Sequence, residues 1–238
     1  MIVTTMPAQI IAKCAPAANR GDELSAWWKA FAGENASVAF RGTLSPPDRG
    51  LEDDLWFLRS VFTDHETSPR YFEQPRLISD SAIRQWAESR RCLVFVLKDL
   101  LGRGAQPSEI RMSLSHSDGA CVAVAVASRE FQGVGVDLEK ADRKVSPAAA
   151  SGFLFASEIA LGASPLEAWV IKEACYKADA SGRQTDVADY RMTALTKAGH
   201  GVVRSIQAEK TDFRFGICRL NGYVLGFSLS PQQPATAT

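Results

Sequence analysis

The chain has 238 residues, and 46% of them are hydrophobic, which is enough for a buried core in one large or two small domains. Lysine and arginine together number 27, as do aspartate and glutamate, so the formal net charge is zero. Because there is no global basic field, we expect no binding to nucleic acid or to an anionic membrane surface.

The cysteines are spread widely along the chain, at Cys14, Cys92, Cys121, Cys175 and Cys218. Their odd number and the lack of a C-x-x-C pair predict neither a disulfide framework nor a zinc site. We therefore expect buried thiols in a cytoplasmic protein, and we recognise no targeting segment. The longest run of small apolar residues, 119–127, is too short to cross a bilayer.

In the first half of the chain, the sequence pattern predicts three ordered segments ahead of the most clearly predicted helix. Asp22–Ala32 has the apolar stripe of an amphipathic helix, Val38–Leu44 alternates as a strand does, and Leu55–Phe62 is a short segment between loops. The helix Ser79–Gly102 follows, since a serine can cap its start and a glycine can end it. The charged residues of these segments are expected to be solvated.

A cluster of serines around one histidine precedes an apolar strand. The cluster reads Ser113-Leu114-Ser115-His116-Ser117, and the strand is predicted over Ala120–Ala127. A lone histidine is more often structural than functional. Three serines beside it at the mouth of a strand nevertheless predict a loop that contacts phosphate.

The segment Gly133–Glu139 predicts a strand with two carboxylates on one face. Its apolar residues alternate with Gly135, Asp137 and Glu139, so the two acids point the same way. Like charges held this close repel each other, and a divalent cation such as Mg²⁺ would remove the repulsion. The alternative is a solvated pair of acids. We expect this strand to pair with Ala120–Ala127 as an antiparallel hairpin across 128–132.

A second helix carries another acid and a cation. Ser164 and Glu167 form a capping box at its start, after a helical region predicted over Pro147–Leu161. Within the helix, Glu173 and Lys177 share one face with Trp169 because the spacing is four residues. The non-functional interpretation of Glu173 and Lys177 is a surface ion pair, which would contribute only about 0.2–1 kcal/mol to stability.

The end of the chain predicts strands. They are expected over Val202–Gln207, Phe213–Leu220 and Tyr223–Ser230, and the last two are joined by a tight turn at Asn221-Gly222. Residues 231–238 form a polar tail.

Three motifs in this order resemble the signature of the 4′-phosphopantetheinyl transferases, in the long Sfp-type or EntD-like branch. They are S-x-S-H-S, then G-V-G-V-D-L-E, then W-x-x-K-E-A-x-x-K, and together they cover about residues 113–178. The resemblance implies an α+β fold of two similar halves about a pseudo-twofold axis. It assigns residues 1–112 to the first half and 113–230 to the second, with 231–238 as a flexible tail, in a monomer.

The activity implied by the resemblance is transfer of 4′-phosphopantetheine from coenzyme A to a serine of an apo acyl or peptidyl carrier protein. Adenosine 3′,5′-bisphosphate would leave. Magnesium, or manganese in its place, would be held by Asp137, Glu139 and Glu173. Glu173 would also take the proton of the carrier serine, Lys177 would act on the phosphates and leaving group, and His116 would assist. The carrier would dock near residues 140–160, by analogy alone.

Coenzyme A contacts are also implied by the resemblance. They fall on Ser115, His116, Lys172 and Lys177, and on Arg84 and Arg90 through the pattern I-R-x-x-x-x-S-R in the first long helix. Arginine suits phosphate because its planar group donates in a fork.

The chain departs from the family in the short connection before Ser113, where relatives carry a longer loop. Arg103 or Arg111 would have to supply any basic group that the longer loop offers to coenzyme A in those relatives. Two alternatives therefore stay open. One is a metal-dependent phosphodiesterase acting on coenzyme A or nucleotides, and the other is a carrier- or coenzyme A-binding protein without catalysis.

Overall fold

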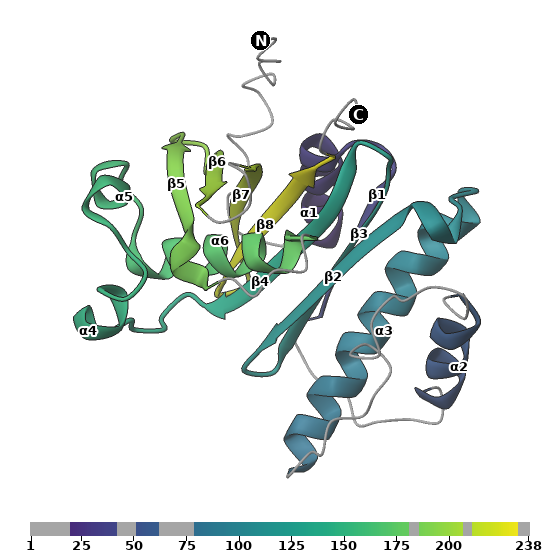
Figure 1. Cartoon of the computed structure of the whole chain (residues 1–238). Helices are drawn as coiled ribbons and strands as arrows, with labels where there is room; N and C mark the ends of the chain where they lie inside the picture. Colours follow the sequence, from purple (N-terminus) through teal and green to yellow (C-terminus); the bar gives the residue numbers. More distant parts are fainter. Residues whose placement is uncertain (1–19, 42–50, 62–78, 181–185, 207–210, 233–238) are drawn as a thin grey trace.

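The structure, a computed structural model, describes residues 20–41, 51–61, 79–180, 186–206 and 211–232. These residues form two antiparallel sheets with helices packed on them, so the expected α+β class is confirmed (Figure 1). Parts of the predicted elements at residues 42–44, 62, 207 and 233–238, together with Cys14, lie outside the described residues.

The helices are α1 (Arg20–Ala32), α2 (Leu51–Val61), α3 (Asp80–Gly102), α4 (Pro147–Ala150), α5 (Ala156–Ala160) and α6 (Pro165–Ala178). Short 3₁₀ turns lie at Pro107–Glu109 and Val187–Asp189. The strands are β1 (Ala36–Arg41), β2 (Ile110–Ser117), β3 (Ala120–Ala127), β4 (Phe131–Lys140), β5 (Tyr190–Leu195), β6 (His200–Ser205), β7 (Asp212–Leu220) and β8 (Tyr223–Pro231).

The first sheet has the order β1-β3-β2, and its central strand is buried on both faces. On β3, the residues that face α3 are small, namely Cys121, Ala123, Ala125 and Ala127. Small side chains let the long helix pack closely on the sheet. The helix begins where predicted, because the Ser79 side chain accepts a hydrogen bond from the backbone N–H of Ala82.

The second sheet has the order β4-β8-β7-β6-β5. The turn between β7 and β8 has Asn221 at φ 50° and Gly222 at φ 82°, as the sequence predicts for a two-residue hairpin. Strand β5 has no counterpart among the predicted strands. It is an edge strand, and its pairing with β6 is irregular between Met192 and Ala194.

One apolar core joins the two sheets. Aromatic residues of α1 pack against β8, with the rings of Trp27 and Phe227 centred 4.9 Å apart. The valines of β3 and the apolar residues of β4 belong to the same cluster, which includes Val122, Val124, Val134, Val136 and Leu138. The predicted alternation of the acidic strand is therefore confirmed, with its apolar residues directed into this core.

Helix α6 lies directly on β4 because two glycines make room for it. A Cβ atom added at Gly133 would lie 1.9 Å from the carbonyl oxygen of Ala178, and one at Gly135 would lie 1.8 Å from that of Ala174. These distances exclude any side chain at either position without a shift of the helix. Glycine is thus required at the two positions of β4 that precede the acids on the same face.

The expected hairpin between Ala120–Ala127 and Gly133–Glu139 is wrong. Strand β3 pairs with β1 and β2, whereas β4 pairs with β8 in the other sheet. Residues 112 and 113, between which we expect the two halves to divide, both lie in β2, and the chain passes from the first sheet to the second at residues 128–130. Periodicity predicts where strands lie along the chain, but it does not identify which strands pair. Pairing depends on how distant segments pack into a common core.

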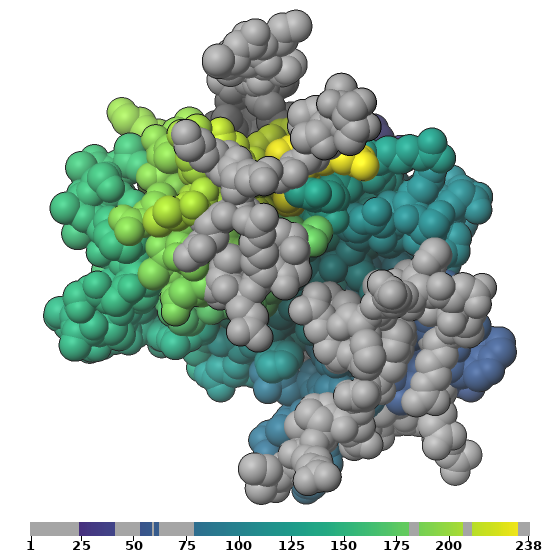
Figure 2. All heavy atoms as spheres, in the orientation of Figure 1, coloured from purple at the N-terminus to yellow at the C-terminus, as the bar shows by residue number. Residues whose placement is uncertain are grey.

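The region predicted as one helix over Pro147–Leu161 contains two short helices. Between α4 and α5 the chain turns so that Phe153 enters the core of the second sheet. This region lies on one side of the molecule, and α2 and α3 lie on the opposite side (Figures 1 and 2). In the part of the chain that the structure describes, no helix is long and apolar enough to cross a membrane.

Candidate functional site

Strand β2 runs beside β4, and serine side chains join the two. Ser113 Oγ accepts a hydrogen bond from the backbone N–H of Val136 at 3.2 Å. Ser115 Oγ donates to Asp137 Oδ1 at 2.9 Å, and Ser117 Oγ donates to Glu139 Oε2 at 3.0 Å. The residue numbers of the bonded partners rise in the same direction along β2 and β4, so the two strands are parallel here. The serine cluster is thus part of a strand that orients the acids, and its prediction as a loop is wrong.

Lys177 of α6 completes the contact between the motifs. Its Nζ donates to Asp137 Oδ1 at 2.7 Å, to Ser115 Oγ at 3.1 Å and to the carbonyl oxygen of Val136 at 3.1 Å. The side chain of Lys177 is 27% exposed and that of Asp137 is 9% exposed. An ammonium with three oxygen acceptors at partial burial is fixed in place. This differs from the exposed Glu173–Lys177 ion pair that the non-functional interpretation predicts.

Asp137 keeps one oxygen unused. Oδ1 takes the bonds from Lys177 and Ser115, whereas Oδ2 is buried and has no hydrogen-bond partner among the described residues. A buried acceptor without a partner costs about 1–3 kcal/mol, and more when it is charged. A bound cation at Oδ2 would remove this cost.

Glu173 belongs to the same electrostatic environment. Its pKa is raised above the ordinary value, first by burial and then by the charge of Asp137, while Lys177 lowers it and Glu139 raises it further. Glu139 is itself held, because Ser117 bonds one oxygen and Arg143 pairs with the other. A divalent cation would relieve the part of this rise in pKa that comes from repulsion by Asp137 and Glu139.

The three carboxylates do not form a ready-made metal cage. Within the residues that the structure describes, no group of three or more histidine, cysteine, aspartate or glutamate side chains is arranged to hold a metal ion. The donor chemistry nevertheless fits Mg²⁺, which prefers oxygen and binds through one or two carboxylates together with substrate phosphates. The unpartnered Oδ2 of Asp137 and the repulsion that Asp137 and Glu139 exert on Glu173 both indicate a site short of positive charge.

His116 lies on the α3 side of β2. Burial lowers its pKa, followed by the charge of Lys177, and Arg90 of α3 lowers it as well. Although His116 is an exposed residue overall, its ring loses enough water to favour the neutral form. Arg90 is buried, donates to Ser89 Oγ at 2.9 Å and stacks over the ring of Trp86 at 4.7 Å. Arg84, six residues earlier on α3, is exposed.

Lys172 does not join the other predicted site residues. It is fully buried, and its Nζ pairs with Glu158 at 2.9 Å and donates to the carbonyl oxygen of Phe153 at 2.6 Å. Residues 172 and 173 differ by about 100° around a helix, so neighbours in the chain point to different faces. Lys172 shares its face with Ala168 and Cys175, which are buried, and this spacing could have revealed its direction.

Arg143 and Glu158 were not predicted from the sequence. Arg143 neutralises Glu139, and Glu158 fixes Lys172 while also accepting the backbone N–H of Met192 at 2.8 Å. Both partners lie in the segment between β4 and α6, where no motif or periodicity pairs them with a particular residue.

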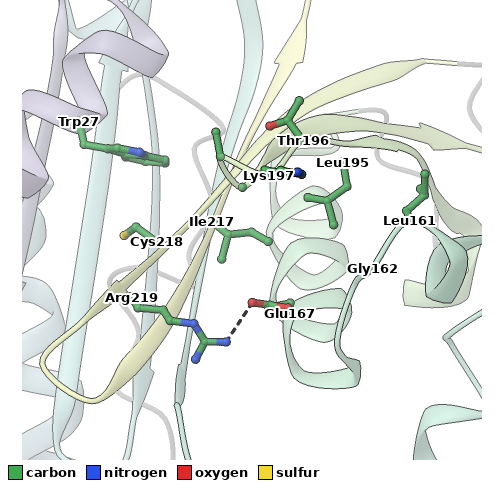
Figure 3. A pocket seen from close by; sticks show the side chains of 12 residues that line it. Trp27, Leu161, Gly162, Glu167, Leu195, Thr196, Lys197, Ile217, Cys218 and Arg219 are labelled. Atoms are coloured by element: carbon green, nitrogen blue, oxygen red, sulfur yellow. Dashed lines mark hydrogen bonds and ion pairs between the residues drawn. The ribbon is translucent and has the colours of Figure 1, made fainter. Parts of the chain in front are cut away.

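A pocket lies elsewhere on the molecule, away from these residues (Figure 3). It has a volume of about 520 Å³, and the side chains of Glu167 and Arg219 point toward each other beside it, 2.9 Å apart. None of the predicted site residues lines it. We place the candidate site at Asp137 and Lys177 despite this pocket, because among the described residues only Asp137 has a buried charged oxygen without a partner.

Four side chains from three segments thus meet at one place: Ser115 of β2, Asp137 of β4, and Glu173 and Lys177 of α6. No protein-family model matches this chain, and a search of curated proteins finds no match either.

Proposed function

We propose that the protein is a 4′-phosphopantetheinyl transferase that moves the phosphopantetheine arm of coenzyme A to a serine of an apo acyl or peptidyl carrier protein. The observation that carries this proposal is the contact of Lys177 with Asp137 and Ser115. It joins the three motifs of the resemblance, which are separate in the sequence, at one site.

Asp137, Glu139 and Glu173 would hold Mg²⁺, with Mn²⁺ as the alternative. The free Oδ2 of Asp137 is the ligand atom best supported, because it has no other partner among the described residues. When bound, the cation supplies positive charge for the pyrophosphate of coenzyme A. Glu139 would share its charge between Arg143, Ser117 and the ion.

Glu173 would act as the general base. Its raised pKa makes it a stronger base than an ordinary carboxylate, and a base of this kind contributes roughly 10²–10⁴-fold to the rate. It would accept the proton of the carrier serine as the serine oxygen bonds to the phosphorus of the phosphopantetheine group. The bond from that phosphorus to the adenosine bisphosphate breaks in the same displacement.

Lys177 would stabilise the charge that develops on the leaving bisphosphate. Its ammonium is already oriented by Asp137, Ser115 and the Val136 carbonyl, so little reorganisation is needed. Ser115 would act as a positioning residue rather than a direct phosphate ligand, because its hydroxyl is buried and bonded to Asp137.

Coenzyme A would bind along the face shared by His116 and the start of α3. Arg84 is exposed, so its guanidinium is available to a phosphate of coenzyme A. Arg90 lies close enough to His116 to lower the pKa of that histidine. Lys172 is left out of this binding surface, because its ammonium is fully buried against Glu158. Arg103 and Arg111 already donate hydrogen bonds within the chain, Arg103 to Asp99 and the Glu34 carbonyl, and Arg111 to the Ser108 carbonyl.

The pseudo-twofold arrangement belongs to the same proposal. Each sheet carries one long helix, α3 on the first and α6 on the second. Each helix has a buried cysteine six residues after a tryptophan, Trp86 before Cys92 and Trp169 before Cys175. We propose that these halves are structurally similar, and that the protein works as a cytoplasmic monomer.

The test is to incubate the full chain with Mg²⁺, coenzyme A and an apo carrier, and then to weigh the carrier by mass spectrometry. We expect the carrier to gain one phosphopantetheine group only when the cation is present. Asp137→Asn should abolish the gain. Asp212→Asn should not, because Asp212 pairs with Arg204 on an exposed part of the second sheet.

Two outcomes would contradict the transferase. Cleavage of coenzyme A without a gain in carrier mass would indicate a phosphodiesterase using the same acids. Binding of coenzyme A or carrier with neither product, for acyl and peptidyl carriers alike, would indicate a protein without catalysis.

A further inference from the structure

Two buried thiols face each other between the first sheet and its helix. Cys92 Sγ of α3 and Cys121 Sγ of β3 are 3.2 Å apart, and the residues are 1% and 0% exposed. A disulfide bond is about 2.05 Å long, so the two sulfurs need to close by only about 1 Å. The sequence, with its odd number of widely spaced cysteines, predicts no such pair.

One of the two thiols borders a pocket. Cys92 lines a pocket of about 410 Å³ together with Ser37, Phe40 and Phe95, and Cys121 is not among its lining residues. Phe95, another lining residue, is 61% exposed, so the pocket is open to solvent there. The pocket thus gives a small reagent a route toward Cys92, whereas the Cys121 sulfur lies 3.2 Å further along that route and does not border the pocket.

We propose that Cys92 and Cys121 form an oxidisable dithiol, with Cys92 as the entry thiol and a peroxide as the oxidant. The Cys92 sulfur attacks the O–O bond and takes one oxygen as a sulfenic acid, and the other oxygen leaves as water with the thiol proton. The Cys121 sulfur then attacks the sulfenic sulfur. The S–S bond forms, the S–O bond breaks, and a second water leaves with the Cys121 proton. Two thiols lose two electrons, and the peroxide is reduced to two waters.

The cross-link would connect α3 to the centre of the first sheet. Cys92 follows Arg90 by two residues, and Cys121 is paired with His116 in the register of β2 and β3. The disulfide would therefore fix the two segments that carry Arg90 and His116. It would also close a loop between residues 29 positions apart, which restricts the unfolded chain.

The experiment exposes the reduced full chain to hydrogen peroxide, blocks the remaining thiols and maps the peptides by mass spectrometry without reductant. We expect the peptide with Cys92 to be linked to the peptide with Cys121, and the link to disappear with dithiothreitol. The thermal unfolding temperature of the oxidised chain should rise by roughly 5–10 °C.

Two variants separate the pair from other thiols. Cys175→Ala should leave the cross-link unchanged, because Cys175 of α6 is fully buried against the second sheet and burial raises its pKa to about 12. Cys121→Ala should abolish the link and leave Cys92 as a sulfenic acid that dimedone captures.

Three results would overturn the proposal. One is no Cys92–Cys121 link in the folded wild-type chain, a measurement that does not depend on any variant folding. The second is a link that forms only in urea. The third is an oxidised chain that unfolds at a lower temperature than the reduced chain, since this would mean that the bond requires distortion of the fold.

Discussion

The Nζ atom of Lys177 lies 2.7 Å from Oδ1 of Asp137, although 40 residues separate the two in the chain. The contact is possible because Gly133 and Gly135 let the backbone of α6 lie directly on β4. The acid and the ammonium therefore occupy a place set by a helix-on-strand contact without intervening side chains.

Replacement of Lys177 by alanine should lower turnover much more than it weakens carrier binding. The ammonium is fixed where charge would develop on the leaving group, and loss of such a donor costs roughly 10²–10³-fold in rate. Steady-state kinetics with the carrier as varied substrate would show a reduced kcat and a nearly unchanged KM. An unaltered kcat would remove Lys177 from the chemistry.

Replacement of Glu173 by glutamine should stabilise the metal-free protein at neutral pH. The pKa of Glu173 is raised in the folded state, so the folded state binds this proton more tightly than the unfolded state does. Stability from this group is therefore greatest below its ordinary pKa of 4.5 and falls as the pH rises through the folded pKa. As the pH rises from 4 to 8, the unfolding temperature of the glutamine variant should therefore fall less than that of the wild-type chain.

The same variant tests the cation. Mg²⁺ should raise the unfolding temperature of the wild-type chain at pH 7 more than that of Glu173→Gln, since one ligand charge is missing in the variant. An equal response of both chains to Mg²⁺ would exclude Glu173 as a ligand, whatever its role in catalysis.

Replacement of Gly135 by alanine should destabilise the protein by about 2–4 kcal/mol, because the new Cβ would lie 1.8 Å from the backbone oxygen of Ala174. Urea unfolding measures this change. Gly102→Ala is the matched control, since a Cβ there meets nothing within 4 Å and the position ends α3. If both variants unfolded at the same urea concentration, the close approach of α6 to β4 would be contradicted.

Replacement of Lys172 by alanine should cost about 3–5 kcal/mol of stability, because Glu158 would remain buried without its counter-charge. Its effect on Mg²⁺ affinity, measured by calorimetry on the folded variant, should be small. A large loss of Mg²⁺ or coenzyme A affinity with unchanged stability would instead return Lys172 to the binding surface.

Local rules account for what could be predicted from the sequence. Alternation places Asp137 and Glu139 on one face of a strand, and the four-residue spacing places Glu173 and Lys177 on one face of a helix. The caps at Ser79 and Ser164 depend only on residues three positions away, and both are present in the structure. The hairpin at Asn221 needs only its own two residues.

Tertiary structure decided which of these elements meet. The pairing of β4 with β8, the parallel contact of Ser115 with Asp137 and the burial of Lys172 against Glu158 each join segments from different parts of the chain. Such contacts depend on how the shared core of α1 and the two sheets is packed, and many strand pairings satisfy the same local periodicity. The sequence alone therefore determines the identity and the local spacing of the acidic residues. Their common site exists only because tertiary packing brings α6 onto the glycines of β4.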